Sequence, residues 1–197
     1  MEVKKMRMEK IKKYFEFKPV RSFSKVMFIL SIVFLCFALL LVITPYMLPP
    51  DSLNLGETGK VNIVDFKSVT DAMPPVAREI YAFGDIMCHQ HASRSYFLNG
   101  NQMPFCSRCT GIFFGLALSS IVLAFVSMDI KIWLIFALLV PMGVDGIAQD
   151  ILTFLHYEST NPLRLVTGLI GGTALGLAIA FIVRTSAEIW QMEREKK

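Results

Sequence analysis

Four runs of apolar residues, each long enough to cross a lipid bilayer, constrain this chain most strongly. A membrane-spanning helix needs about 20 predominantly apolar residues. The runs cover residues 26–48, 110–127, 132–155 and 163–183. A soluble domain of 197 residues could not bury the 54% of its residues that are hydrophobic. The sequence therefore predicts an all-α membrane protein built as a four-transmembrane-helix bundle.

Basic residues predict the orientation of this bundle. Nine of the 20 Lys and Arg residues lie between Lys4 and Lys25, immediately before the first run. The positive-inside rule then predicts a multi-pass protein of the cell membrane with both termini in the cytoplasm. The cytoplasmic parts are residues 1–25 and 184–197, and the extracytoplasmic parts are residues 49–109 and 156–162. This distribution explains the net charge of +4 without a nucleic-acid partner.

Glycines in two of the runs predict close helix packing. Gly111 and Gly115 are four residues apart in the second run, and Gly168, Gly172 and Gly176 repeat that spacing in the fourth. Small residues at this spacing let helix backbones approach each other in lipid. We interpret these glycines as packing positions and assign them no chemistry.

The segment 49–109 contains two local signals. Pro74 and Pro75 stand near the start of a predicted amphipathic helix, which we expect to lie at the membrane surface or over the bundle. Its apolar face is predicted to consist of Val76, Ile80, Phe83 and Met87. Further on, Asn99-Gly100 between short strand-like runs predicts a β-hairpin.

Three of the four cysteines fall within 22 positions and predict a metal site. Cys106 and Cys109 form a Cys-x-x-Cys motif, and Cys88 lies upstream next to His89 and close to His91. Three cysteines and one histidine are a standard tetrahedral zinc set. The sequence therefore predicts bound Zn²⁺. A complete set leaves no open coordination position, which favours a structural role over a catalytic one.

Two other interpretations of these cysteines stay open. Cys106 and Cys109 stand at the head of a helix, where the helix dipole lowers a thiol pKa, as in thiol–disulfide or quinone-linked redox proteins. Such proteins normally use a second cysteine pair, whereas only Cys88 remains here. A structural disulfide between Cys88 and one partner would leave one thiol over.

A second cluster of polar residues interrupts the third run. Asp145, Gln149 and Thr153 recur every four residues, and His156 follows. A carboxylate inside a membrane needs a partner, and Arg164 at the start of the fourth run is the predicted one. An Asp145–Arg164 ion pair that only locks two helices is the alternative interpretation.

We expect the polar cluster and the cysteine motif to open on one outward-facing pocket. The predicted catalytic residues are Asp145, Glu158, Arg164 and Arg94. The predicted substrate-binding residues are Gln149, Arg108, His156 and Thr167.

The order of these motifs resembles the signature of a widespread prokaryotic integral-membrane protein family of unknown function. The matching motifs are Cys88-His89-Gln90, Arg94-Ser95, Cys106-x-Arg108-Cys109-x-Gly111, Asp145-Gly146-x-x-Gln149 and the stretch from Glu158 to Gly168. The resemblance covers roughly residues 85–185 and implies no activity. It implies that the residues of these motifs belong to the family pattern. Since His91 is not part of the signature, the resemblance favours His89 as the fourth zinc ligand.

The sequence thus predicts a zinc-binding membrane protein whose polar pocket serves a membrane-embedded enzyme acting on a lipid or lipid-linked substrate. Arginines at a lipid-facing surface suit a phosphate or carboxylate headgroup. A redox protein using Cys106 and Cys109, and a non-enzymatic transporter or scaffold subunit, are the alternatives. The chain contains no Walker loop, nucleophile elbow or His-Glu-x-x-His motif, so the sequence offers no support for an ATPase, a serine hydrolase or a common zinc protease.

Overall fold

Four long helices make up the bundle in the computed structural model, which describes residues 20–21, 23–152 and 159–195. They are α2 (Lys25–Ile43), α5 (Ser107–Phe125), α6 (Ile132–Leu152) and α7 (Asn161–Glu195). Within the described residues, these four are long and apolar enough to cross a membrane, α2 together with the 3-10 helix η1 (Thr44–Met47) that continues it. The predicted four-helix membrane bundle is confirmed.

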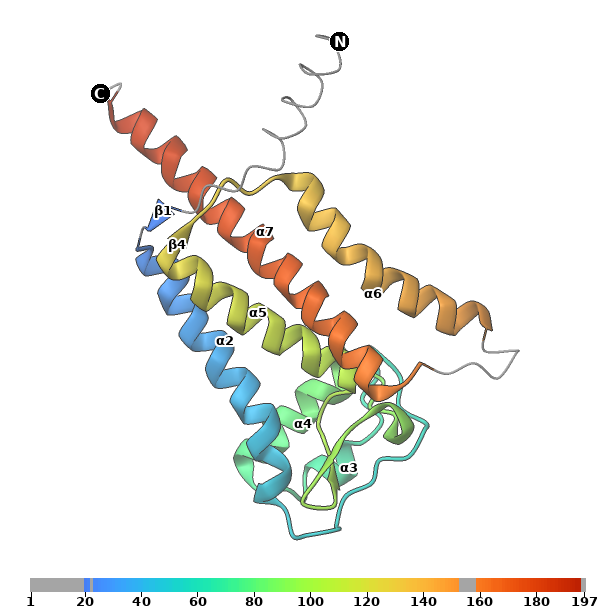
Figure 1. The fold of residues 1–197 in the computed structure, drawn as a ribbon. Coiled ribbons are helices and arrows are strands. Elements are labelled where there is room, and N and C mark those ends of the chain that lie inside the picture. Colours follow the sequence, from blue (N-terminus) through green and yellow to red (C-terminus); the bar gives the residue numbers. More distant parts are fainter. Residues whose placement is uncertain (1–19, 22, 153–158, 196–197) are drawn as a thin grey trace.

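The helices lie side by side in the order α2, α5, α7, α6 (Figure 1). The α5–α7 contact is the most intimate because glycines bring the two backbones together. A Cβ atom at Gly168 would overlap the carbonyl of Arg108, and one at Gly172 would overlap the carbonyl of Ile112. Gly111 and Gly115 meet the α7 backbone in the same way. The predicted close packing at these glycines is confirmed.

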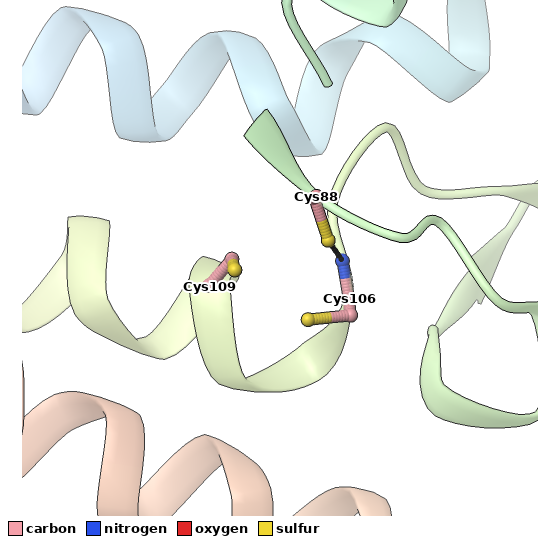
Figure 2. Close-up of side chains that lie close together, drawn as sticks. All are labelled: Cys88, Cys106 and Cys109. Atoms are coloured by element: carbon pink, nitrogen blue, oxygen red, sulfur yellow. Dashed lines mark hydrogen bonds between the residues drawn. The ribbon is translucent and has the colours of Figure 1, made fainter. Parts of the chain in front are cut away.

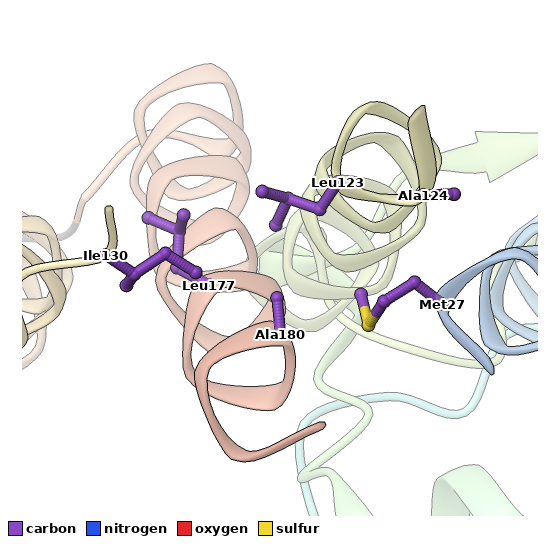
Figure 3. Close-up of a cluster of buried hydrophobic side chains, with 6 residues drawn as sticks. All are labelled: Met27, Leu123, Ala124, Ile130, Leu177 and Ala180. Carbon is purple, nitrogen blue, oxygen red and sulfur yellow. The ribbon is translucent and has the colours of Figure 1, made fainter. Parts of the chain in front are cut away.

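A buried apolar cluster holds one end of the bundle together (Figure 3). It consists of Met27, Leu123, Ala124, Ile130, Leu177 and Ala180. The guanidinium of Arg184 lies nearby and donates to the carbonyls of Val126 and Met128 at 2.8 and 2.7 Å. These bonds close the turn between α5 and α6. Strands β1 (Val20–Arg21) and β4 (Val126–Ser127) pair at the same end.

The other end carries the smaller elements of the chain. These are α3 (Lys67–Thr70), α4 (Pro75–Met87), η2 (Ala92–Arg94), β2 (Phe97–Leu98) and β3 (Asn101–Gln102). The β2–β3 pair confirms the predicted hairpin, and both turn residues, Asn99 and Gly100, have positive φ. We call this the cysteine end, because Cys88, Cys106 and Cys109 lie there.

Two buried amides organise the loop that precedes α4. The Asn101 Oδ1 atom accepts hydrogen bonds from the backbone N–H groups of Ser52 and Leu53, both at 2.9 Å. The Gln102 Oε1 atom accepts one from Leu55 at 2.8 Å. Both amide side chains are fully buried, so each replaces water for a loop that has no regular secondary structure.

Helix α4 packs against the protein with a face that lies beside the predicted apolar face. The face in contact with the protein consists of Ala77, Ile80, Tyr81, Gly84 and Asp85. Of the residues predicted for the apolar face, only Ile80 is buried, whereas Val76, Phe83 and Met87 are exposed. The reason is that Gly84 packs directly against the Pro104 carbonyl, which only a residue without a side chain allows.

Helix α7 extends beyond the predicted membrane span of residues 163–183 and ends at Glu195. The residues beyond Arg184 are mostly good helix formers. The Arg194 guanidinium lies 4.4 Å above the Trp190 ring, one turn earlier, and this contact stabilises the extension.

Candidate metal centre and adjoining cavity

Three cysteine sulfurs converge at the cysteine end (Figure 2). Cys88 directly follows α4, Cys106 is the N-cap residue of α5, and Cys109 lies in the first turn of α5. Their Sγ atoms all lie within 4.8 Å of one another. The Cys106 N–H donates a hydrogen bond of 3.4 Å to the Cys88 sulfur, which fixes the two segments against each other.

Gln90 holds the Cys88 segment in place, a role that our sequence analysis did not assign. Its Nε2 atom donates to the carbonyls of Pro104 at 2.8 Å and Tyr81 at 3.2 Å. The residue has a φ of 48° and is 1% exposed. Its place in the motif after Cys88 and His89 was the only signal in the sequence. The amide bridges α4 to the residues that lead into α5, so it sets the spacing of the sulfurs.

The cysteine thiols differ in pKa because their surroundings differ. Hydrogen bonds from the Cys109 and Cys88 thiols hold the pKa of the Cys106 thiol well below its usual value. The hydrogen bond to Cys106, together with burial, raises the pKa of Cys88 to about 12. Cys106 is therefore the most acidic thiol of the group, and its sulfur accepts hydrogen bonds from the other two thiols.

The donor set fits a thiophilic metal ion. In tetrahedral zinc with Zn–S bonds of about 2.3 Å, neighbouring sulfurs stand roughly 3.8 Å apart. Sulfurs that lie within 4.8 Å need to close by no more than about 1 Å to reach this spacing. All three thiols are free of disulfides, and Cys88 is 3% exposed.

The predicted fourth ligand is not in this group. The metal-ligand atoms that come together within the described residues belong to the three cysteines alone, although His89 follows Cys88 directly. His89 instead lines the cavity that Cys106 also lines. His89 as the fourth ligand, and with it a structural role for the zinc, stays a prediction.

The second polar cluster forms around Asp145 on α6. Its carboxylate pairs with the guanidinium of Arg108 and accepts hydrogen bonds from the hydroxyls of Ser159 at 2.5 Å and Thr167 at 3.3 Å. The predicted ion pair with Arg164 is wrong in its partner. Gly168 explains the difference, since it brings the first turn of α5 against α7 and so carries Arg108 to Asp145.

A cavity of about 170 Å³ joins the two clusters. It is lined by His89, His91, Arg94, Cys106, Arg108, Gly146, Gln149 and Arg164. The predicted convergence of the cysteine motif and the polar cluster on one pocket therefore agrees with the geometry. Thr167 lies beside the cavity through its bond to Asp145. Glu158 and His156, predicted for the same pocket, lie outside the described residues, as does Thr153.

The arginines of the cavity are held in fixed positions. With its amide oxygen turned toward Arg94, Gln149 accepts hydrogen bonds from Nη1 at 2.6 Å and Nη2 at 2.8 Å. Arg108 is held by Asp145, yet its buried Nε atom has no hydrogen-bond partner within the described part of the chain. Arg164 is 2% exposed and lies next to Asn161. This arrangement presents fixed positive charge to whatever enters the cavity.

The two histidines separate this cavity from a wider hollow of about 670 Å³. Their rings lie 5.5 Å apart, and both residues line both spaces. The His91 ring is placed by the Gly59 carbonyl, 3.1 Å from Nε2, and by the Glu57 carboxylate, 3.6 Å from Nδ1. Glu57 was not predicted as a member of the site, because no motif marks the loop from which it comes.

Comparison with known proteins finds a family match over the part of the chain that carries both clusters. A family model described as "Predicted membrane protein (DUF2085)" matches residues 88–178, a range that begins at Cys88 and includes both clusters. An uncharacterized protein of Methanocaldococcus jannaschii is 37% identical over 149 residues, which cover 73% of this chain and 83% of that protein. An uncharacterized protein of Methanothermobacter thermautotrophicus is 36% identical over 98 residues, covering 47% of this chain and 82% of the relative. No solved structure matches the chain.

Proposed function

The chain belongs to the family described as predicted membrane protein (DUF2085), and on this basis we propose that it is a zinc-binding integral membrane protein whose adjoining pocket binds the anionic group of a lipid or lipid-linked substrate. In this proposal Cys88, Cys106 and Cys109 bind the ion. The cavity next to them is the substrate site of a membrane-embedded enzyme.

One observation carries the proposal: Cys106 belongs to both parts of the site. Its sulfur is one of the three converging sulfurs, and the residue also lines the cavity. Three protein ligands leave a fourth coordination position for water or substrate, as catalytic zinc sites do. When bound, a zinc ion of this kind supplies Lewis-acid polarisation of an oxygen ligand.

The charge of the cavity supports an anionic ligand. Three arginines line it, and one of them, Arg108, is paired with the carboxylate of Asp145. Guanidinium groups bind phosphate and carboxylate oxygens with two parallel hydrogen bonds. The cavity lies where α5, α6 and α7 begin or end their apolar spans, which is the depth of lipid headgroups in a bilayer.

We assign the roles within the pocket as follows. Arg94 and Arg164 contact the anionic group directly, with Arg108 and Gln149 completing its coordination. Asp145 is a positioning residue, because its oxygens already accept bonds from Arg108, Ser159 and Thr167. Glu158 and His156 remain proposed members of the pocket by their place in the sequence. The cysteine end faces the extracytoplasmic side of the cell membrane, as the basic residues before Lys25 indicate.

Metal analysis of the purified protein tests the first half of the proposal. We expect about one zinc per chain in the native protein, and loss of it in Cys88→Ser, Cys106→Ser and Cys109→Ser. The matched control is Cys36→Ser, since Cys36 is an exposed thiol in α2 far from the other three in sequence. Equal zinc contents in all four variants would overturn the assignment.

Ligand binding tests the second half. Vesicles or nanodiscs containing a phosphomonoester lipid should bind the native protein, and Arg94→Gln or Arg164→Gln should weaken this binding at unchanged zinc content. Inorganic phosphate in competition separates recognition of the phosphate from recognition of the whole lipid. Unchanged lipid binding in both variants would contradict the role of the cavity.

A thiol-based redox protein is the second candidate, favoured by the lowered pKa of Cys106 next to two other sulfurs. It predicts a Cys106–Cys109 disulfide and no zinc in protein purified without reductant. Titration of free thiols alongside the metal analysis separates the two candidates, because bound zinc requires the cysteines to be reduced.

A further inference from the structure

Helix α4 exposes a row of large apolar residues that the fold itself leaves uncovered. Phe83 is 39% exposed, Ile86 42%, Met87 54% and Val76 48%. They occupy the flank next to the inward face, so they are not part of the contact that holds α4 in place. In water, four such residues on one short helix would form an apolar patch of the kind that marks an interaction site.

The aromatic contacts of Phe83 show how deep this row lies along the membrane-spanning helices. Its ring lies 5.7 Å from that of Phe37 on α2 and 5.8 Å from that of Phe105. Phe37 precedes Met47, where the first apolar span ends, by ten residues, or about 15 Å at roughly 1.5 Å per residue. Phe37 also contacts Phe113, six residues inside the second span, or about 9 Å. Two helices therefore place Phe83 beside the apolar part of the bundle.

The row also continues a surface that must face lipid. On α2, Leu39 and Ile43 are exposed between Phe37 and the end of the span at Met47, and they belong to a helix that spans the membrane. Figure 1 shows α4 beside the part of α2 nearest the cysteine end. Glu79 lies on the same flank one turn before Phe83 and pairs with Arg78 at 3.2 Å in the first half of the helix. The second half of the flank is apolar.

We propose that α4 is an interfacial helix whose Phe83, Ile86 and Met87 insert into the bilayer leaflet at the cysteine end. Such helices bury one apolar flank roughly 5–10 Å into the headgroup and acyl boundary. Because Cys88 directly follows α4, the inserted helix fixes the cysteine group and its cavity at headgroup depth. The inference depends on the position of α4 and stands whether or not the cysteines bind zinc.

Tryptophan placed along α4 tests the insertion in nanodiscs. In a background in which Trp133 and Trp190, the two native tryptophans, are replaced by Phe, single variants Phe83→Trp and Met87→Trp are compared with Arg78→Trp as the matched control. Quenching by lipids brominated on the acyl chain should be several-fold stronger at 83 and 87 than at 78. Quenching by aqueous acrylamide should show the opposite order.

Either of two results overturns the proposal. Acrylamide quenching at 83 and 87 as strong as at 78 would place the row in water. Protection of both positions from bromolipid and acrylamide alike would mean that another protein surface, such as a second copy of the chain, covers the row. Met87→Trp keeps the test valid if Phe83→Trp disturbs the contact with Phe37, because Met87 is more than half exposed.

Discussion

Replacing Asp145 by Asn should destabilise the bundle because it removes the charge that holds Arg108. The carboxylate is 7% exposed and satisfies three donors: the Arg108 guanidinium and the hydroxyls of Ser159 and Thr167. Asparagine keeps one acceptor oxygen but turns an N–H₂ group toward groups that are themselves donors. A hydrogen bond to a charged group contributes about 1.5–3 kcal/mol, and breaking a fully buried ion pair costs about 3–5 kcal/mol.

The expected loss lies in the upper part of the first range. The Arg108 side chain is 24% exposed, so part of its charge stays solvated after the change. We therefore expect a loss of about 2–3 kcal/mol, which for a chain of this size corresponds to a decrease in apparent Tm of roughly 4–12 °C. Fluorescence-detected size-exclusion chromatography of heated, detergent-solubilised protein measures the shift.

A double-mutant cycle isolates the pair. Arg108→Met alone should also destabilise the protein, and the double variant should be less destabilised than the sum of the two by at least about 1 kcal/mol. Asp71→Asn is the control, since Asp71 is exposed and its carboxylate makes no hydrogen bond within the described residues. Additive effects, or equal shifts for Asp145→Asn and Asp71→Asn, would refute the pairing.

Three further predictions concern packing, loop structure and thiol reactivity. Gly168→Ala should destabilise the bundle by about 1–3 kcal/mol in thermal denaturation, because the added Cβ overlaps a backbone carbonyl on α5. Gly143→Ala is the control and should have little effect, because its Cβ has open space. Tyr81→Phe should lower stability by about 1 kcal/mol in the same assay, since a 2.5 Å hydrogen bond to a buried carbonyl is lost. In metal-free protein, Cys106 should react with iodoacetamide at a lower pH than an ordinary thiol, because its lowered pKa keeps the sulfur ionised at that pH. Mass spectrometry measures the rate of alkylation, and a rate that rises only at alkaline pH would contradict this prediction.

Much of the architecture was predictable because lipid limits the choices. A run such as 26–48 crosses the membrane only as a helix, and glycines four residues apart predict close helix contact. The hairpin was predictable because Asn99-Gly100 suits a tight turn with positive φ. These features depend on neighbours in sequence, or on a property of the solvent that the whole chain shares.

The parts that were missed depend on contacts between distant segments. Arg108 was predicted to bind substrate, and its place between two cysteines gave no sign of its ion pair with Asp145, which follows from the packing of α5 on Gly168. The inward face of α4 is set by the approach of Gly84 to Pro104, which no periodicity reveals. Gln90 is likewise a single amide whose two carbonyl partners come from separate segments.

The coordination shell of the metal in purified native protein tests the central claim most directly. Zinc K-edge X-ray absorption should show three sulfur neighbours at about 2.3 Å and one nitrogen or oxygen neighbour at roughly 2.0–2.1 Å. Addition of phosphate should change the light-atom neighbour and leave the sulfur shell intact. Absence of zinc, or zinc with fewer than three sulfur neighbours, would contradict the assignment of Cys88, Cys106 and Cys109 as its ligands.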